Sequence, residues 1–370
     1  MILIFKILFP MILKPRISPG DIFILICLVF IIVPISIWIY FNNPEKCNNQ
    51  NYTLPKYVSF KDSDLGFDVS SVVINNSNQT VIGAGNSSEI YILDLDGEKD
   101  YPTLQTEFKG FRSLALNEEV GYLVGGALDG SVVLWQLDKS SKNGWSQDYI
   151  ILPEKQSQYI SSVAISRSGK LIGASSKDTI LIWINSKSEN KWKLRHKIFS
   201  GHSGRYIFDL VFGNNDQTLF TVGNDKRIKI WNLDTQDTIE NREEIFSHKD
   251  SWSINSLVFR TEHNELIFGT NNGQIKVWNV QDKPEKAEEL IGEHDSQPVN
   301  ALAISEEGKL LVSGSNDNTI KLWNLCSKES FKTLSKHKEW VRSVDISLDN
   351  IHIVSGSLDN KIIIWKRENE

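Results

Sequence analysis

Apolar and polar residues alternate with a period of two along most of the chain after residue 56. This period places successive side chains on opposite faces of a strand, so these segments are predicted to be β-strands. The stretch VNALAISEEGKLLVSGSNDNTIKLWNL, from Val299 to Leu325, contains three such strands separated by two tight turns, and the last strand carries a tryptophan. Apolar segments between units, such as residues 149–152 and 331–334, predict a fourth and weaker strand.

The same unit recurs along the chain. Its third strand ends at Trp135, Trp183, Trp231, Trp278, Trp323 and Trp365, and a first copy (EIYILDL) has Leu93 at this place. The intervals are 42, 48, 48, 47, 45 and 42 residues, which is the period of one propeller blade. The repeats therefore predict an all-β fold over residues 57–370, a seven-bladed β-propeller of four-stranded antiparallel blades.

The two ends of the repeat region predict how the ring closes. The chain ends on the Trp365 strand with no fourth strand after it, whereas the segment KYVSFK (residues 56–61) precedes the first complete unit. We expect this segment to become the outer strand of the last blade, because closure protects strand edges that would otherwise be open to aggregation.

The repeats resemble the WD-repeat propeller family over about residues 57–366. The marker of that family is a His before the first strand, a Ser or Thr on the second, an Asp in the next turn and the Trp on the third. A partial copy contains His248, Phe268, Asn272 and Trp278, and the first three copies lack the His although Asp129 and Asp178 remain. Three copies carry the full set: His202, Thr221, Asp225, Trp231; His294, Ser313, Asp317, Trp323; and His337, Ser355, Asp359, Trp365.

The resemblance implies that each set is a structural hydrogen-bond relay within one blade. The four histidines are 46, 46 and 43 residues apart, one per blade, so a shared metal site is not expected. The repeated aspartates also occur once per unit, which argues against a catalytic pair. No P-loop, GxSxG, HExxH or GxGxxG motif is present, so we expect no catalysis, no cofactor and no metal.

Proteins of the resembled family often bind peptides or protein surfaces on the face that carries the His and Asp turns. Alignment of the first strands puts one residue of each blade at the mouth of the central channel: Ser70, Arg112, Ser161, Phe208, Asn255, Asn300 and Arg342. Aromatic residues and arginines are frequent interface anchors. The candidate partner-binding residues are therefore Arg112, Tyr159, Tyr206, Phe208, Trp252, Asn255, Asn300, Trp340 and Arg342. The alternative for Trp252 and Trp340 is that they only cover the blade tops.

Residues 22–41 contain no charge, and twenty helical residues span the hydrocarbon core of a bilayer. The sequence thus predicts a transmembrane helix over 22–41, a short cytoplasmic segment over 1–21 and a linker over 42–56. A cleaved signal peptide is the alternative, but the apolar run is too long and no small-x-small cleavage site follows it.

Charges flanking this helix predict its orientation. Lys6, Lys14, Arg16 and the terminal amine precede it, whereas Lys46 is offset by Glu45 after it. The positive-inside rule then keeps the N-terminus in the cytoplasm and puts the propeller on the other side. Four N-glycosylation sequons suit that side, although a chain rich in Asn, Ser and Thr contains such matches by chance. They begin at Asn51, Asn75, Asn78 and Asn86.

Composition narrows the partner class. The net charge is −6, with +3 on residues 1–56 and −9 on the rest. An acidic body disfavours nucleic acid, whose binders carry basic surfaces. The three cysteines, Cys27, Cys47 and Cys326, form no CxxC motif and predict no disulfide framework.

These patterns favour a membrane-anchored scaffold that binds protein or peptide partners. A ligand-binding or enzymatic propeller that uses the central channel is the alternative, and unexplained acids or histidines on the channel-facing strands would support it. We identify no such cluster in the sequence. A third possibility is a repeat domain of a signalling or assembly system whose other activities lie in separate chains.

Overall fold

The computed structural model describes residues 55–97, 99, 101–186, 191–199, 202–233, 244–281 and 289–368. For residues 244–249 and 289 it describes only the backbone. The predicted transmembrane helix over 22–41, the segment 1–21 and nearly all of the linker lie outside these residues. Within the described residues, no helix has both the length and the apolar character needed to cross a membrane.

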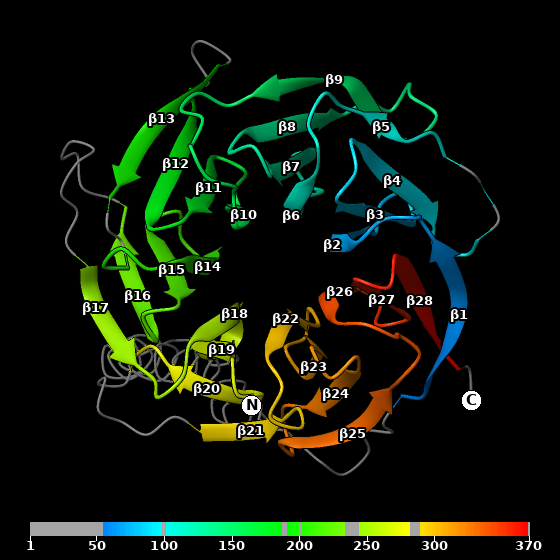
Figure 1. Cartoon of the computed structure of the whole chain (residues 1–370), viewed down its shortest axis with the longest axis vertical. Coiled ribbons are helices and arrows are strands. Elements are labelled where there is room, and N and C mark those ends of the chain that lie inside the picture. The colour runs from blue at the N-terminus through cyan, green and yellow to red at the C-terminus, as the bar shows by residue number, and fades with distance from the viewer. Residues whose placement is uncertain are drawn as a thin grey trace, which may run out of the picture. The chain divides into compact units, whose positions relative to one another are not determined.

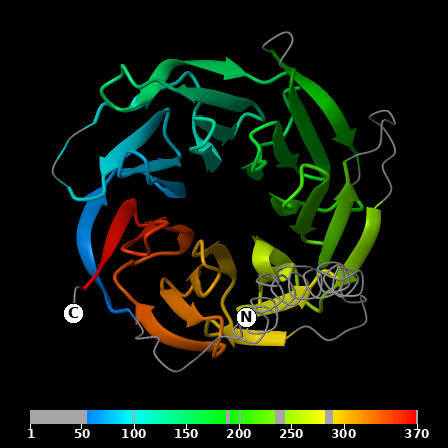
Figure 2. The same ribbon diagram turned by 180° about the vertical axis from the view of Figure 1, so that it is seen from behind.

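Seven four-stranded antiparallel sheets form the described part of the chain. They are arranged as blades around a common axis, with the first strand of each blade innermost (Figure 1). Figure 2 shows the same ring from behind. The predicted all-β, seven-bladed propeller is confirmed.

The first three blades follow chain order. Blade 1 contains β2 (Val69–Asn75), β3 (Thr80–Gly85), β4 (Glu89–Asp94) and β5 (Leu104–Gln105). Blade 2 contains β6 (Phe111–Asn117), β7 (Tyr122–Ala127), β8 (Val132–Leu137) and β9 (Trp145–Ile151). Blade 3 contains β10 (Ser162–Ile165), β11 (Leu171–Ser176), β12 (Thr179–Ser186) and β13 (Lys191–Ile198).

The next three blades repeat this order. Blade 4 contains β14 (Ile207–Phe212), β15 (Thr218–Gly223), β16 (Arg227–Asn232) and β17 (Glu244–Lys249). Blade 5 contains β18 (Ile254–Arg260), β19 (Glu265–Thr270), β20 (Gln274–Asn279) and β21 (Glu289–Glu293), with the short 3-10 turn η2 (Thr261–His263) between its first two strands. Blade 6 contains β22 (Val299–Ile304), β23 (Leu310–Ser315), β24 (Ile320–Asn324) and β25 (Glu329–Leu334).

Blade 7 combines the two ends of the repeat region. It contains β26 (Val341–Ile346), β27 (His352–Ser357) and β28 (Lys361–Arg367), and its outer strand is β1 (Tyr57–Asp64). The strands β1 and β28 are antiparallel, with Tyr57 opposite Arg367 and Asp64 opposite Lys361. The predicted closure by the N-terminal strand is confirmed, and the pairing extends three residues beyond Lys61.

Burial decreases from the second strand of a blade to its outer strand. Every residue of β23 and β27 is buried, because neighbouring blades cover both faces of these strands. In the outer strand β1, buried or partly buried residues alternate with exposed ones. The sequence pattern follows this gradient, with continuous apolar or small residues in the second strands and alternation outside.

The hydrophobic core is divided into seven layers, each between two adjacent blades. Close approach of the blades requires glycine at some contacts. A Cβ atom on Gly356 would lie 2.6 Å from a methyl carbon of Val69, and one on Gly314 would lie 2.7 Å from a methyl carbon of Val341. A side chain at either position would push blades apart.

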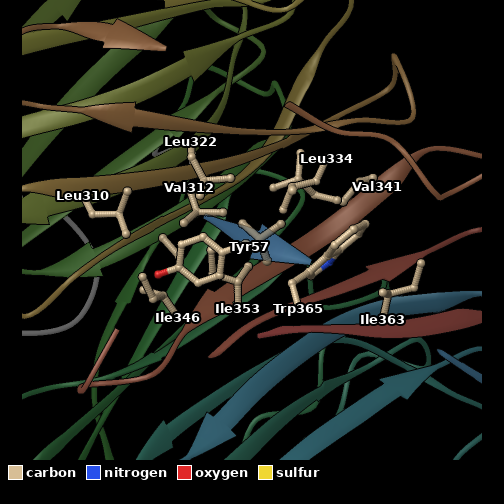
Figure 3. Packing of buried hydrophobic residues seen from close by; sticks show 13 residues of the cluster. Tyr57, Leu310, Val312, Leu322, Leu334, Val341, Ile346, Ile353, Ile363 and Trp365 are labelled. Carbon is tan, nitrogen blue, oxygen red and sulfur yellow. The ribbon is translucent and has the colours of Figure 1, made fainter. Parts of the chain in front are cut away.

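The layer between blades 6 and 7 includes Tyr57 of the closing strand. Its ring lies among Val312 and Leu322 of blade 6 and Ile353 of blade 7 (Figure 3). The side chain is 1% exposed, and its hydroxyl donates to the carbonyl oxygen of Asn350 at 2.6 Å. One residue of β1 thus joins the closing strand to two blades.

Ring closure can be tested on Tyr57. Tyr57→Ala is expected to lower the free energy of unfolding by about 3 to 5 kcal/mol, since it empties a filled site between two blades. Deletion of residues 56–61 is expected to cost at least as much. The check is the thermal or denaturant midpoint of the full chain.

The control for this test is Val58→Ala, whose side chain on the same strand is 44% exposed. It should leave the midpoint nearly unchanged. An unchanged melting temperature after deletion of residues 56–61 would contradict closure by this strand.

Candidate functional site

One face of the ring carries the connections into the first strands and the turns between second and third strands; it is called the upper face here. Main-chain hydrogen bonds join these two kinds of segment within a blade, for example Asn224 N–H to Tyr206 and Asn316 N–H to Pro298. The face thus consists of braced loops on rigid strands, which is where binding residues are usually found.

A cavity of about 580 Å³ lies on the axis, enclosed by the innermost strands. The residues aligned by sequence at the channel mouth all line it: Ser70, Arg112, Ser161, Phe208, Asn255, Asn300 and Arg342. Side chains from seven blades thus meet at one opening, in the size range of small-ligand sites. Asn271, Pro298 and Asn316, on or next to the upper-face turns, also line the cavity and were not among the residues selected from the sequence.

An aromatic and cationic cluster occupies one side of this mouth. The rings of Tyr159 and Tyr206 are stacked, with centroids 6.1 Å apart and an interplanar angle of 13°. The guanidinium carbon of Arg112 lies 5.7 Å from the centre of the Tyr159 ring. The structure therefore groups three of the predicted partner-binding residues, from blades 2, 3 and 4.

Trp252 and Trp340 do not line the cavity. Both lie on upper-face connections, next to blades 5 and 7, and they are 47% and 44% exposed. Large aromatic side chains with this exposure are not fully buried by packing and can contact a partner. The structure thus leaves a substantial part of each indole accessible on the upper face.

On the opposite side of the mouth, the side-chain amide of Asn300 forms hydrogen bonds within the protein. The side-chain N–H₂ of Asn300 donates to Asn316 at 2.6 Å and to the carbonyl oxygen of Val341 at 2.8 Å. The second bond crosses from blade 6 to blade 7. Asn300 therefore has a role in joining blades besides its place at the mouth.

The three sets of His, Ser or Thr, Asp and Trp each lie within one blade. In blade 6, His294 Nδ1 is 2.7 Å from an Asp317 oxygen and Nε2 is 2.7 Å from Ser313 Oγ. Ser313 Oγ accepts from the indole N–H of Trp323 at 2.8 Å. A neutral imidazole satisfies every group, because Nδ1–H donates to the carboxylate and Nε2 accepts from the hydroxyl.

Blades 4 and 7 repeat this geometry. His202 contacts Asp225 at 2.6 Å and Thr221 at 2.8 Å, and Trp231 donates to Thr221 at 2.9 Å. The corresponding distances in blade 7 are 2.9, 2.8 and 2.9 Å, among the residues His337, Asp359, Ser355 and Trp365. All three imidazoles are buried, so they are not available to bind a ligand.

Burial and hydrogen bonding shift the pKa values of His337, Asp317 and Asp359. Burial lowers the pKa of the His337 imidazole, which favours the neutral form that the relay needs. Burial raises the pKa of Asp317, but hydrogen bonds from His294 and Thr319 outweigh burial and leave the pKa below its ordinary value. In blade 7, where the pKa of Asp359 is also lowered, a neutral His337 beside an ionised Asp359 is therefore favoured near neutral pH.

The other blades replace the relay in different ways. In blade 3, Ala174 takes the hydroxyl position and the indole N–H of Trp183 donates to the carbonyl oxygen of Pro153 at 2.9 Å. In blade 2, Gly125 takes that position and the buried indole N–H of Trp135 has no hydrogen bond in the described structure. Blade 5 has Phe268 there, and the side chain of His248, the expected partner, lies outside the described structure.

Three segments match the family model of the WD domain, G-beta repeat: residues 192–232, 288–324 and 328–366. Each matched segment contains one complete set of His, Ser or Thr, Asp and Trp. With the seven-bladed ring, these matches support the WD-repeat propeller family. A search of curated proteins finds no match to the chain.

The blades are joined near the axis by hydrogen bonds from the residue after each mouth position. This residue is Ser, Asp or, in blade 6, Ala. Its side chain bonds the first strand of an adjacent blade, and Asn300 serves the boundary where Ala301 cannot. The bonded pairs are Ser71 with Leu114, Ser113 with Val163, Ser162 with Asp209, Asp209 with Leu257, Ser256 with Val299, and Ser343 with Val72.

Two carboxylates line the cavity of the ring. Asp209 accepts from Ser162 of blade 3 at 2.8 Å and from the Leu257 N–H of blade 5 at 3.0 Å. Asp345 accepts from the Ile74 N–H of blade 1 at 2.8 Å. Burial raises the pKa of each above 3.8 to about 6, although these hydrogen bonds act in the opposite direction.

These two aspartates lie on different blades and were not among the candidate residues, because only one blade carries an acid at each of these positions. Their hydrogen bonds to neighbouring blades account for both without catalysis. In the part of the chain that the structure describes, no three His, Cys, Asp or Glu residues are grouped as a metal would require.

The relay of blade 6 can be tested with Ser313→Ala. The substitution leaves His294 Nε2 and the Trp323 N–H without partners inside the protein, so a loss of about 1 to 3 kcal/mol is expected. Ser330→Ala, on the exposed outer strand of the same blade, should change stability by less than about 0.5 kcal/mol. Equal denaturant midpoints for the two variants would argue against the relay.

The channel carboxyls predict a specific pH dependence. Between about pH 4 and 6 the folded state binds more protons at Asp209 and Asp345 than the unfolded state does, because their folded pKa values are raised to about 6. Their contribution therefore favours folding at acidic pH and is lost as the pH rises through about 6. The expected size is on the order of 1 to 3 kcal/mol per group.

The measurement is the unfolding free energy from pH 4.5 to 7.5. Relative to the wild type, Asp209→Asn and Asp345→Asn should each reduce this loss of stability with rising pH by the part that the substituted carboxyl contributes. Asp148→Asn, at an exposed position of β9, should follow the wild-type profile. Parallel profiles for all four proteins would contradict the assignment.

Proposed function

We propose that this chain is a non-catalytic, membrane-anchored scaffold that binds protein partners through the upper face of its propeller. The observation that supports this most directly is the channel mouth. It combines a cavity of about 580 Å³ with the Tyr159–Tyr206 stack and two accessible tryptophans nearby. Tyrosine, tryptophan and arginine are the side chains that most often dominate the free energy of protein association.

A scaffold function agrees with the roles of the polar groups in the described part of the chain. The histidines of blades 4, 6 and 7 are held in relays, and the two channel aspartates are held by neighbouring blades. A catalytic acid or base needs access to a substrate proton. The alternative, a propeller that performs chemistry in its channel, would require one of these structural groups to leave its partners.

The anchor and its orientation are part of the proposal. They rest on the uncharged run at residues 22–41 and on the basic residues before it. Of the sequons in the described residues, Asn78 and Asn86 are exposed and Asn75 is buried. Of these three, only Asn78 and Asn86 could therefore carry a glycan on the folded propeller.

The experiment is proximity labelling by the full chain with a labelling enzyme fused to its C-terminus, together with protease accessibility on sealed membranes. We expect protection of the propeller from protease added on the cytoplasmic side. Trp252→Ala combined with Trp340→Ala should reduce the recovery of labelled partners, since truncating an interface anchor costs about 2 kcal/mol or more, roughly 30-fold in affinity.

The matched control is Phe60→Ala, an exposed aromatic on the outer strand β1 that is 46% exposed. It should leave the labelled set unchanged. Unchanged recovery with the double tryptophan variant, in a folded protein, would contradict binding through the upper face. Digestion of the propeller from the cytoplasmic side would overturn the orientation.

A further inference from the structure

Two arginines meet at the channel mouth without a carboxylate partner. Arg112 and Arg342 occupy the same aligned position in blades 2 and 7, and blade 1 between them has the small Ser70 there. Neither guanidinium forms a hydrogen bond or ion pair within the described structure; Arg112 contacts only the face of Tyr159. Two such groups facing one cavity leave their N–H donors available to a ligand.

The surroundings of Arg342 are unfavourable to its charge. Burial and, to a smaller extent, the positive charge of Arg112 lower the pKa of its guanidinium to about 10, and only the Tyr159 hydroxyl acts in the opposite direction. No carboxylate contributes to the pKa of Arg342. Asp345 lies on the same strand three residues away, about 10 Å along a strand, where it bonds to blade 1.

Burying like charges together without a counter-ion costs free energy, and this free energy is regained when an anion binds between them. Arginine forks match the two oxygens of a carboxylate or phosphate group. The mouth therefore has the charge and the donor geometry of an oxyanion site, with the stacked tyrosines as an apolar wall beside it.

We propose that Arg112 and Arg342 together bind one oxyanion, a carboxylate or phosphate group, on a peptide segment of the protein partner. This inference rests on the proposed function and specifies the chemistry of the partner. A peptide is favoured because the propeller body carries a charge of −9 outside residues 1–56. That charge repels a polyanion at long range, whereas a short segment with a single oxyanion experiences mainly the two local guanidiniums.

The test uses the full chain in a non-ionic detergent and immobilised peptide pools with randomised flanks. The central residue is fixed as Glu, phosphoserine, Gln or Lys. We expect the wild type to bind a Glu or phosphoserine pool at least about 10-fold better than the Gln and Lys pools. Arg112→Gln and Arg342→Gln should abolish that preference, and Arg342→Lys should weaken it.

The matched control is Arg205→Gln, which removes the same charge from an exposed connection of the upper face. It should retain the preference. Because the two arginines repel each other, Arg112→Gln and Arg342→Gln are expected to keep or raise the melting temperature. A purely structural role for the arginines would instead lower it, so the melting temperature is a second readout.

A second arm measures the phosphorus NMR linewidth of inorganic phosphate at constant ionic strength. Preference for the Glu pool alone identifies a carboxylate, and preference for the phosphoserine pool alone identifies a phosphate. Binding of all pools alike, or a preference that survives both glutamine substitutions, overturns the oxyanion site but leaves the scaffold function. If the phosphate signal broadens only when both arginines are present and no peptide pool binds, the anion site is retained. The peptide source and the proposed upper-face function are then overturned.

Discussion

The pairing of β1 with β28 is the constraint on which the rest of the structure depends. Each apolar layer lies between two blades, so the layer between blades 6 and 7 is complete only when Tyr57 is in place. Without the last pairing, the outer edge of β28 would be exposed along its length. The segment that closes the ring also directly follows the predicted linker, so the propeller would be connected to its anchor through its closing strand.

Cohesion between blades has an apolar and a polar component. The seven layers supply burial, and the side chains near the axis supply one hydrogen bond or more at each boundary. The relays brace blades 4, 6 and 7 internally, whereas blade 2 has a buried indole N–H with no bond within the described structure. The internal bracing of the ring is therefore uneven, while its inter-blade bonding is continuous.

The polar groups of the channel divide into two kinds. Asp209 and Asp345 are engaged by neighbouring blades and serve cohesion. Arg112 and Arg342 serve no described contact of that kind, and their mutual repulsion opposes stability. A residue that lowers stability and makes no compensating structural contact is expected to have a functional role. We therefore assign the proposed function to the upper mouth rather than to the channel interior.

The sequence by itself determined the blade count, the strand order, the closing strand and the members of the three relays, because each depends on local periodicity or on residues at fixed offsets. It also placed Arg112 and Arg342 at equivalent positions. Only the tertiary structure decided that the two lie close enough to interact, that Tyr159 stacks on Tyr206, and that Asp209 and Asp345 bond to adjacent blades. These contacts join residues of different blades, and a repeat pattern fixes positions within a blade but not the distances between side chains across the ring.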